Sequence, residues 1–262
     1  MSDLEQLASD LADEQAALDA LVAGLDEADW RRDTPARGWT VRDQIAHLAF
    51  FDAAGAQAIT DPAAFLVARD ELVRAAFAEG VDEFTLHALR GVSPERVLAT
   101  WRENRATLND AAGRLTRESR VPWYGPEMSG RSFLTARLME TWAHGVDVAD
   151  ALGVAPSNSA RLAHVVRLGV ITRDWSYRVR GESAPEVSIA LRLDGPDATY
   201  EHGPSDADEV ITGPALDFCL VVTQRRHLDD TDLVTGEWGR HWMLRAQAFA
   251  GGPTTGPAPR ST

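Results

Sequence analysis

Leucines recur at helical spacing in the first part of the chain. Apolar positions three, four and seven residues apart predict an amphipathic helix over residues 4–28, with one face formed by Leu4, Leu7, Leu11, Leu18, Leu21 and Leu25. Thr40 followed by Asp43 has the spacing of a helix N-cap and its capping partner. This pair predicts a second helix that ends near residue 60.

Prolines mark the starts of two further helices. Pro62 and Pro94 each follow a residue that can cap a helix, and the helix from Pro94 is expected to end near residue 117. Residues 118–132 are rich in proline and glycine and are predicted to be a loop. A last long helix is predicted from about residue 132 to 152, where Gly153 is a natural stop. Several long helices joined by loops indicate an all-α bundle over residues 1–155.

The pattern changes after Gly153. Residues 159–180 favour a helix, whereas VSIALRLDG alternates apolar and polar positions as a half-buried strand does. Two more short strands and two more helices are predicted from DATYEHG, EVITG, PALDFCLVVTQRR and EWGRHWMLRAQAFA. Residues 156–250 are therefore predicted to be an α+β domain, and residues 251–262 a disordered tail.

Composition limits the class of partner. The formal net charge is −14, and all 26 basic residues are arginine. Such an acidic balance argues against nucleic acid and against an anionic membrane surface as partners. The single cysteine, Cys219, rules out an intrachain disulfide, and the acidic start of the chain does not resemble a signal peptide. We therefore expect a cytoplasmic protein, either a monomer or a homodimer.

Three side chains on two predicted helices form the chemically most informative group. Glu140 and His144 are four residues apart, so both lie on one helix face, and His47 lies in an apolar stretch of another helix. Two imidazoles and one carboxylate suit zinc or another borderline divalent metal and leave a coordination position open. The alternative is that His47 is an ordinary core histidine and that Glu140 and His144 form an ordinary helical side-chain pair.

The stretches around these residues resemble a known family. GWTVRDQIAHLAFFD and, about ninety residues later, ETWAHGVDVADALG are similar to the metal-binding domain of mycothiol-dependent maleylpyruvate isomerases, a DinB-like four-helix bundle. The matching positions are Trp39, Val41, Asp43, His47, Leu48, Glu140, His144, Asp147 and Val148. The resemblance implies that His47, Glu140 and His144 bind the metal. Zinc is the expected metal, with nickel or iron as other candidates. The second half resembles, more loosely, the sterol-carrier-protein-like domain that often follows this bundle.

The resemblance implies a thiol-dependent enzyme with mycothiol as co-substrate. The expected reaction is isomerisation of a small electrophilic acid or transfer of the thiol to it. A metal-dependent hydrolase and a non-catalytic, metal-stabilised binding protein remain open alternatives.

Supporting roles are assigned to residues near the predicted ligands and to arginines elsewhere. Asp43, Gln44 and Asp147 are candidates to orient the ligands from a second layer. Substrate or thiol could be bound by Arg137, Arg225, Arg226, Trp123 and Tyr124.

Overall fold

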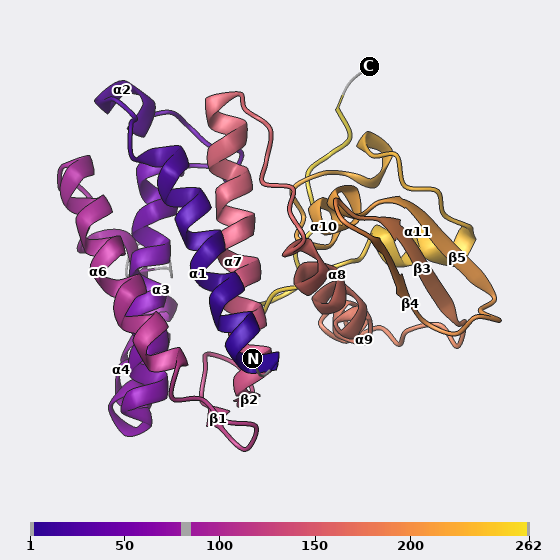
Figure 1. Cartoon of the computed structure of the whole chain (residues 1–262), viewed down its shortest axis with the longest axis horizontal. Coiled ribbons are helices and arrows are strands. Elements are labelled where there is room, and N and C mark those ends of the chain that lie inside the picture. Colours follow the sequence, from indigo (N-terminus) through magenta and orange to yellow (C-terminus); the bar gives the residue numbers. More distant parts are fainter. Residues whose placement is uncertain (1–2, 80–84, 261–262) are drawn as a thin grey trace. The chain divides into compact units, whose positions relative to one another are not determined.

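The computed structural model describes residues 3–79 and 85–260, and it divides into two compact units, Met1–Ser157 and Asn158–Thr262 (Figure 1). The division lies close to the boundary predicted at residue 155. The chain is largely helical, with two small sheets. None of the described helices combines the length and the apolar composition needed to cross a membrane.

Helices dominate the first unit. They are α1 (Asp3–Val22), α2 (Glu27–Trp30), α3 (Val41–Thr60), α4 (Pro62–Glu79), α6 (Pro94–Ala112) and α7 (Gly130–Leu152). The first predicted helix was too long, because the chain turns after Val22 and starts the separate helix α2. The predicted loop at 118–132 contains a short antiparallel pair, β1 (Arg120–Val121) and β2 (Met128–Ser129).

Local capping fixes where the two site-bearing helices begin and end. Thr40 and Asp43 form the predicted capping box at α3, with the Thr40 backbone amide donating to Asp43 Oδ2 at 2.8 Å. Ser129 caps α7 by accepting a hydrogen bond from the Ser132 amide at 3.1 Å. Gly153 ends α7 with a φ of +70°, a left-handed conformation that favours glycine.

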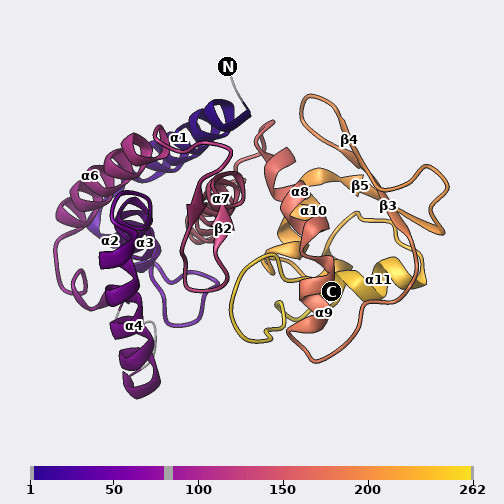
Figure 2. The same ribbon diagram turned by 90° about the horizontal axis from the view of Figure 1, so that it is seen from below.

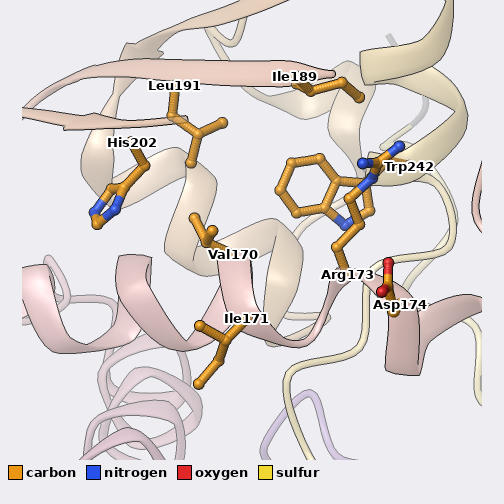
Figure 3. Close-up of a pocket in the computed structure, with 8 residues that line it drawn as sticks. All are labelled: Val170, Ile171, Arg173, Asp174, Ile189, Leu191, His202 and Trp242. Carbon is orange, nitrogen blue, oxygen red and sulfur yellow. The ribbon is translucent and has the colours of Figure 1, made fainter. Parts of the chain in front are cut away.

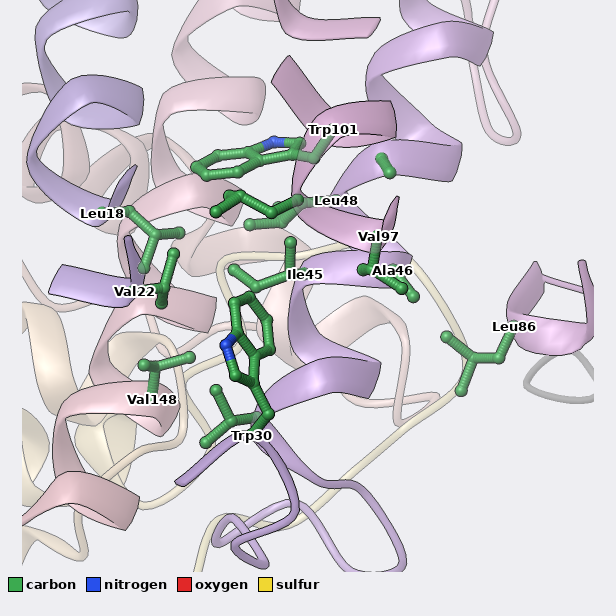
Figure 4. Close-up of a cluster of buried hydrophobic side chains, with 13 residues drawn as sticks. Leu18, Val22, Trp30, Ile45, Ala46, Leu48, Leu86, Val97, Trp101 and Val148 are labelled. Atoms are coloured by element: carbon green, nitrogen blue, oxygen red, sulfur yellow. The ribbon is translucent and has the colours of Figure 1, made fainter. Parts of the chain in front are cut away.

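The long helices pack around one apolar core. Neighbours follow the cyclic order α1, α7, α3, α6, and the view in Figure 2 looks along these helices. The core between them includes Leu18, Ile45, Leu48, Trp101 and Val148, as Figure 4 shows. Fully burying such a side chain contributes about 1.5–3 kcal/mol, so this cluster anchors α3 against α6 and α7.

The second unit combines a three-stranded sheet with short helices. Its elements are α8 (Leu162–Ile171), α9 (Arg173–Arg178), β3 (Ile189–Asp194), β4 (Thr199–His202), β5 (Glu209–Pro214), α10 (Ala215–Val222), the 3₁₀ turn η1 (Leu228–Asp230) and α11 (Glu237–Met243). Strand β3 is central, antiparallel to β4 and parallel to β5. The helix predicted over 159–180 is broken at Thr172, and the last predicted helix ends at Met243.

The C-terminal segment has no helix or strand over residues 251–260. Its Thr254 amide donates to Gln247 Oε1 at 3.2 Å, and the Arg260 amide donates to Asp230 Oδ1 at 3.0 Å. Residues 261–262 of the predicted disordered tail lie outside the described residues.

Candidate metal centre

The fold brings the three predicted ligands together. His144 Nε2 lies 3.3 Å from Glu140 Oε2, and His47 Nε2 lies 3.9 Å from the same oxygen. One candidate ligand atom from each residue lies within 4.8 Å of the other two. Ligand atoms of a tetrahedral zinc site with bonds of ~2.1 Å are about 3.4 Å apart, so these residues fit a divalent metal. No second cluster of this kind occurs among residues 3–79 and 85–260.

Helix geometry explains the convergence. On α3, residues at positions 44, 47 and 51 follow a three-then-four spacing that places Gln44, His47 and Phe51 on one face. On α7, Glu140 and His144 are one turn apart on a shared face. Because α3 packs directly against α7, the two faces meet.

A chain of hydrogen bonds orients His144. The Thr34 hydroxyl donates to the Trp39 carbonyl at 2.9 Å, so its oxygen is free to accept from Gln44 Nε2 at 2.8 Å. This contact fixes the amide of Gln44 with Oε1 towards His144 Nδ1, 2.5 Å away. Nδ1 of His144 therefore carries a proton, and Nε2 is the ring nitrogen that faces Glu140. Metal-ligating histidines are held in this way by a hydrogen bond from their other ring nitrogen.

The imidazole of His47 is neutral at pH 7. Burial, and then the nearby His144, lowers the pKa of His47 to about 4. Its Nδ1 atom is buried without a hydrogen-bond partner among the described residues. The rings of Trp39 and Phe51 flank it, with centroids 5.0 and 4.5 Å away. A neutral imidazole in an aromatic setting is a suitable metal ligand.

The carboxylate of Glu140 is ionised. Burial alone would raise the pKa of Glu140, but the adjacent imidazoles of His144 and His47 outweigh it and hold the pKa well below its usual range. The side chain is still 28 % exposed, so one side of the cluster is open to solvent. The arrangement thus offers two imidazole nitrogens and one anionic oxygen, with an accessible side.

The residues predicted to support the ligands lie in different settings. Gln44 contacts His144 directly, as described above. Asp43 accepts hydrogen bonds from the Thr40 amide and hydroxyl, so its carboxylate caps α3. Asp147 is buried, one turn beyond His144 on α7.

Arg137 belongs to a buried polar network that the sequence analysis missed. Its Nη2 atom donates to Asp52 Oδ1 at 2.7 Å, and both side chains are almost fully buried. The other oxygen of Asp52 accepts from Trp101 at 3.1 Å and from Gln15 at 3.3 Å. The signal for this network was an aspartate inside the apolar stretch LAFFDAAGA, since a buried carboxylate requires a partner.

Trp123 and Tyr124 are connected to the candidate ligand His47 through the aromatic ring of Phe51. Tyr124 packs against Phe51 with centroids 5.5 Å apart, and Phe51 packs against His47. Trp123 stacks on Phe65 at 5.6 Å. Burial raises the pKa of Tyr124 to about 12, so its hydroxyl stays protonated at neutral pH. These aromatic groups form an apolar wall beside the candidate ligands.

Arg225 and Arg226 lie in the second unit, just after α10. Arg225 Nη1 donates to the Thr223 carbonyl at 2.7 Å, and Arg226 Nη1 donates to the Arg225 carbonyl at 2.8 Å. Arg226 also lines a cavity of about 250 Å³ with residues 255–259 of the C-terminal segment. A role for either arginine in substrate binding stays a prediction.

Comparison with known families identifies the first unit. Residues 11–149 match the family model described as "Mycothiol maleylpyruvate isomerase N-terminal domain". The chain belongs to this family. The resemblance inferred from the two sequence stretches is thereby confirmed, and the matched segment contains all three candidate ligands of this family member.

Relatives and solved structures extend the match beyond that segment. Two uncharacterized proteins of Mycobacterium tuberculosis, from strains CDC 1551 and H37Rv, are each 43 % identical over 98 % of this chain and 100 % of theirs. A crystal structure of the mycothiol-dependent maleylpyruvate isomerase aligns with a TM-score of 0.60 and 17 % identity over 91 % of this chain and 94 % of that chain. A histidine-to-alanine mutant of that enzyme aligns with a TM-score of 0.59 and 16 % identity, over 88 % and 93 % of the two chains. At this identity the structures show a shared fold.

Proposed function

We propose that this protein is a thiol-dependent enzyme that binds one divalent metal, most favourably zinc, through His47, Glu140 and His144. Mycothiol is the proposed co-substrate, and the substrate is a small electrophilic acid that is isomerised or becomes attached to the thiol. The observation that carries the proposal is the convergence of the three ligand atoms within 4.8 Å of one another. Membership of the mycothiol maleylpyruvate isomerase family supports the choice of thiol.

The side chains of the site have separate tasks in this proposal. When bound, the metal would lower the pKa of a coordinated thiol and favour the thiolate, a nucleophile able to add reversibly to an activated double bond. Gln44 holds the His144 ring in the tautomer that presents Nε2 to the metal. The rings of Phe51 and Tyr124 limit access of water to one side of the site. The exposed edge of Glu140 marks where the small molecules enter.

Other assignments are part of the same proposal. The first unit is assigned to the DinB-like four-helix bundles and the second to the sterol-carrier-like domains. Arg225 or Arg226 is assigned to the carboxylate of the substrate, because paired N–H donors recognise carboxylates. The site is expected to work in the cytoplasm, with nickel and iron as alternative metals.

Two measurements test the proposal. Elemental analysis of the native protein should find about one divalent metal per chain, with strong loss of metal in His47→Ala and His144→Ala. Full metal occupancy in both variants would refute the site. The metal-loaded protein should consume maleylpyruvate only when mycothiol is present.

The competing functions predict different results in that assay. Turnover without any thiol would favour a metal-dependent hydrolase. Thermal stabilisation by metal without turnover of any thiol-dependent reaction would favour a non-catalytic binding protein. Gln15→Met is a suitable control for both measurements, since Gln15 is buried but contacts Asp52 rather than a candidate ligand.

A further inference from the structure

The second unit contains a cavity of about 320 Å³ between strand β3 and helices α8, α9 and α11. Figure 3 shows its principal lining side chains, which include Val170, Arg173, Ile189, Leu191, His202 and Trp242. All of these residues belong to Asn158–Thr262. The cavity is therefore a feature of this unit, and none of the candidate metal ligands lines it.

Apolar side chains from three helices and strands form part of the cavity lining. Leu191 from β3, Val170 from α8 and the indole ring of Trp242 from α11 converge there (Figure 3). The volume holds about ten groups of water size at ~30 Å³ each, which places it at the lower end of small-molecule sites. A short branched or aromatic body fits these dimensions, whereas a long hydrocarbon chain exceeds them.

Two residues that line the cavity, Arg173 and Trp242, each carry a buried donor that lacks an acceptor. Arg173 Nε and Trp242 Nε1 are both buried without a hydrogen-bond partner among the described residues, and Trp242 is only 2 % exposed. The Arg173 guanidinium lies over the Trp242 ring, 5.9 Å from its centroid, and its Nη2 donates to the Pro185 carbonyl at 3.1 Å. Because buried N–H groups are nearly always paired in folded proteins, this pair indicates a missing acceptor.

The remaining charged groups are consistent with an anionic acceptor. Burial, and then the charge of Arg167, lowers the pKa of His202, so this imidazole is neutral at pH 7. Asp174 also lines the cavity, but its side chain is exposed at the rim, where solvent and salt screen its charge. Arg173 therefore provides the positive charge next to the apolar interior.

We propose that this cavity binds a small carboxylate with a compact apolar body. The two carboxylate oxygens accept from Arg173 and Trp242, and the apolar body packs against Val170 and Leu191. A carboxylate offers two acceptors to two donors, which satisfies both buried N–H groups at once. The proposal does not depend on the metal or on the thiol chemistry of the first unit.

Benzoate is a suitable probe. Its binding to the full-length protein can be followed by NMR through the indole N–H signals of the tryptophans. Trp242→Phe, which keeps an aromatic ring, assigns the Trp242 signal. We expect saturable binding with a downfield shift of that signal. Arg173→Gln should weaken binding by about tenfold or more, since a hydrogen bond to a charged group is lost. Arg173→Lys should retain part of the affinity.

Matched controls separate this site from others. Arg178→Gln alters an exposed arginine on the same helix and should leave benzoate affinity unchanged. The candidate metal centre is another place where a carboxylate can bind. His144→Ala alters that centre and should also leave benzoate affinity unchanged, because the proposed cavity is lined by residues of the second unit. Benzyl alcohol has the same ring without the charge and should bind at least about tenfold more weakly.

Several outcomes would overturn the proposal. Binding that leaves the Trp242 signal in place, or that is equally tight in folded Arg173→Gln protein, excludes the assigned carboxylate contacts. Loss of benzoate binding in His144→Ala would assign the anion to the first unit. Tighter binding of palmitate, a long-chain carboxylate, than of benzoate would contradict a compact apolar body.

Discussion

Replacing Gln44 by methionine should weaken metal binding without removing any ligand. Methionine has nearly the shape of glutamine, but its thioether is a far weaker acceptor for the hydrogen bond from His144 Nδ1, a contact of 2.5 Å in the structure. Gln44 is 0 % exposed, so water does not readily replace the lost acceptor. The His144 ring then loses the contact that selects its tautomer and orientation.

The size of the expected loss in metal affinity can be judged from other metal-binding histidines that are oriented by a hydrogen bond. Removal of such an orienting hydrogen bond typically costs ten- to hundredfold in metal affinity. At 1.4 kcal/mol per factor of ten, this corresponds to about 1.4–2.8 kcal/mol of binding free energy. We expect the upper part of this range, because the chain from Thr34 through Gln44 to His144 is buried and leaves few alternative partners.

Competition with a chromophoric zinc chelator measures the affinity. Gln44→Glu keeps an acceptor next to Nδ1 and should bind zinc more tightly than Gln44→Met. Gln15→Met removes a different buried glutamine, bonded to Asp52 at 3.3 Å, and should leave zinc affinity unchanged. Thermal unfolding of the metal-free proteins shows whether each variant is folded. Zinc affinity in folded Gln44→Met within about twofold of the original protein would refute the reasoning.

Three further predictions concern stability. Arg137→Met leaves Asp52 buried without its ion-pair partner and should cost about 3–5 kcal/mol in urea unfolding. A hydrogen bond from Arg102 holds the pKa of Asp19 below its usual value, so its ionised form stabilises the protein above the unfolded-state pKa. This contribution is lost as pH falls through the lower folded-state pKa, and Asp19→Asn should therefore flatten the loss of unfolding free energy as pH falls below about 4. Gly169→Ala should destabilise the second unit by about 1–3 kcal/mol, measured by thermal unfolding, because the added Cβ meets an aromatic ring carbon of α10 at 2.7 Å.

Each of these predictions has its own control. Adding Asp52→Leu to Arg137→Met should recover part of the stability, and no recovery would show that the ion pair is not the cause. Asp70→Asn changes an exposed carboxylate and should leave the loss of unfolding free energy at acidic pH unchanged. If it flattened that loss as much as Asp19→Asn does, the role of Asp19 would be contradicted. Gly24→Ala places its Cβ where no atom lies within 4 Å. If Gly24→Ala lowered the thermal stability as much as Gly169→Ala, overpacking against α10 would not be the cause.

Helix starts could be predicted from the sequence because they depend on local chemistry. Thr40 with Asp43 and proline at position 62 act within one turn, and α3 and α4 begin as predicted. The break at Thr172 and the parallel pairing of β3 with β5 were missed. Pairing between strands about twenty residues apart depends on how the sheet packs against the helices, and the local pattern does not contain that information.

The grouping of His47, Glu140 and His144 could be predicted from the sequence, whereas the contacts that support these side chains could not. Spacing of four residues places Glu140 and His144 on one face regardless of the rest of the fold. Gln44 was one of three candidates to orient a ligand, and only the packing of α3 on α7 singles it out. Thr34 lies ten residues before Gln44, outside any helix, so no periodicity could link it to the site.

The identity of the orienting residue has an electrostatic consequence. Histidine ligands are often oriented by carboxylates, but here the partner of His144 is the neutral amide of Gln44. With both imidazoles as neutral ligands and Glu140 as the single anion, a divalent cation bound as proposed would keep a net charge of +1 at the site. Such a residual charge favours an anionic fourth ligand, as a thiolate would be. Gln44→Glu lowers this charge to zero, so it should strengthen zinc binding while weakening the binding of anions to the zinc-loaded protein.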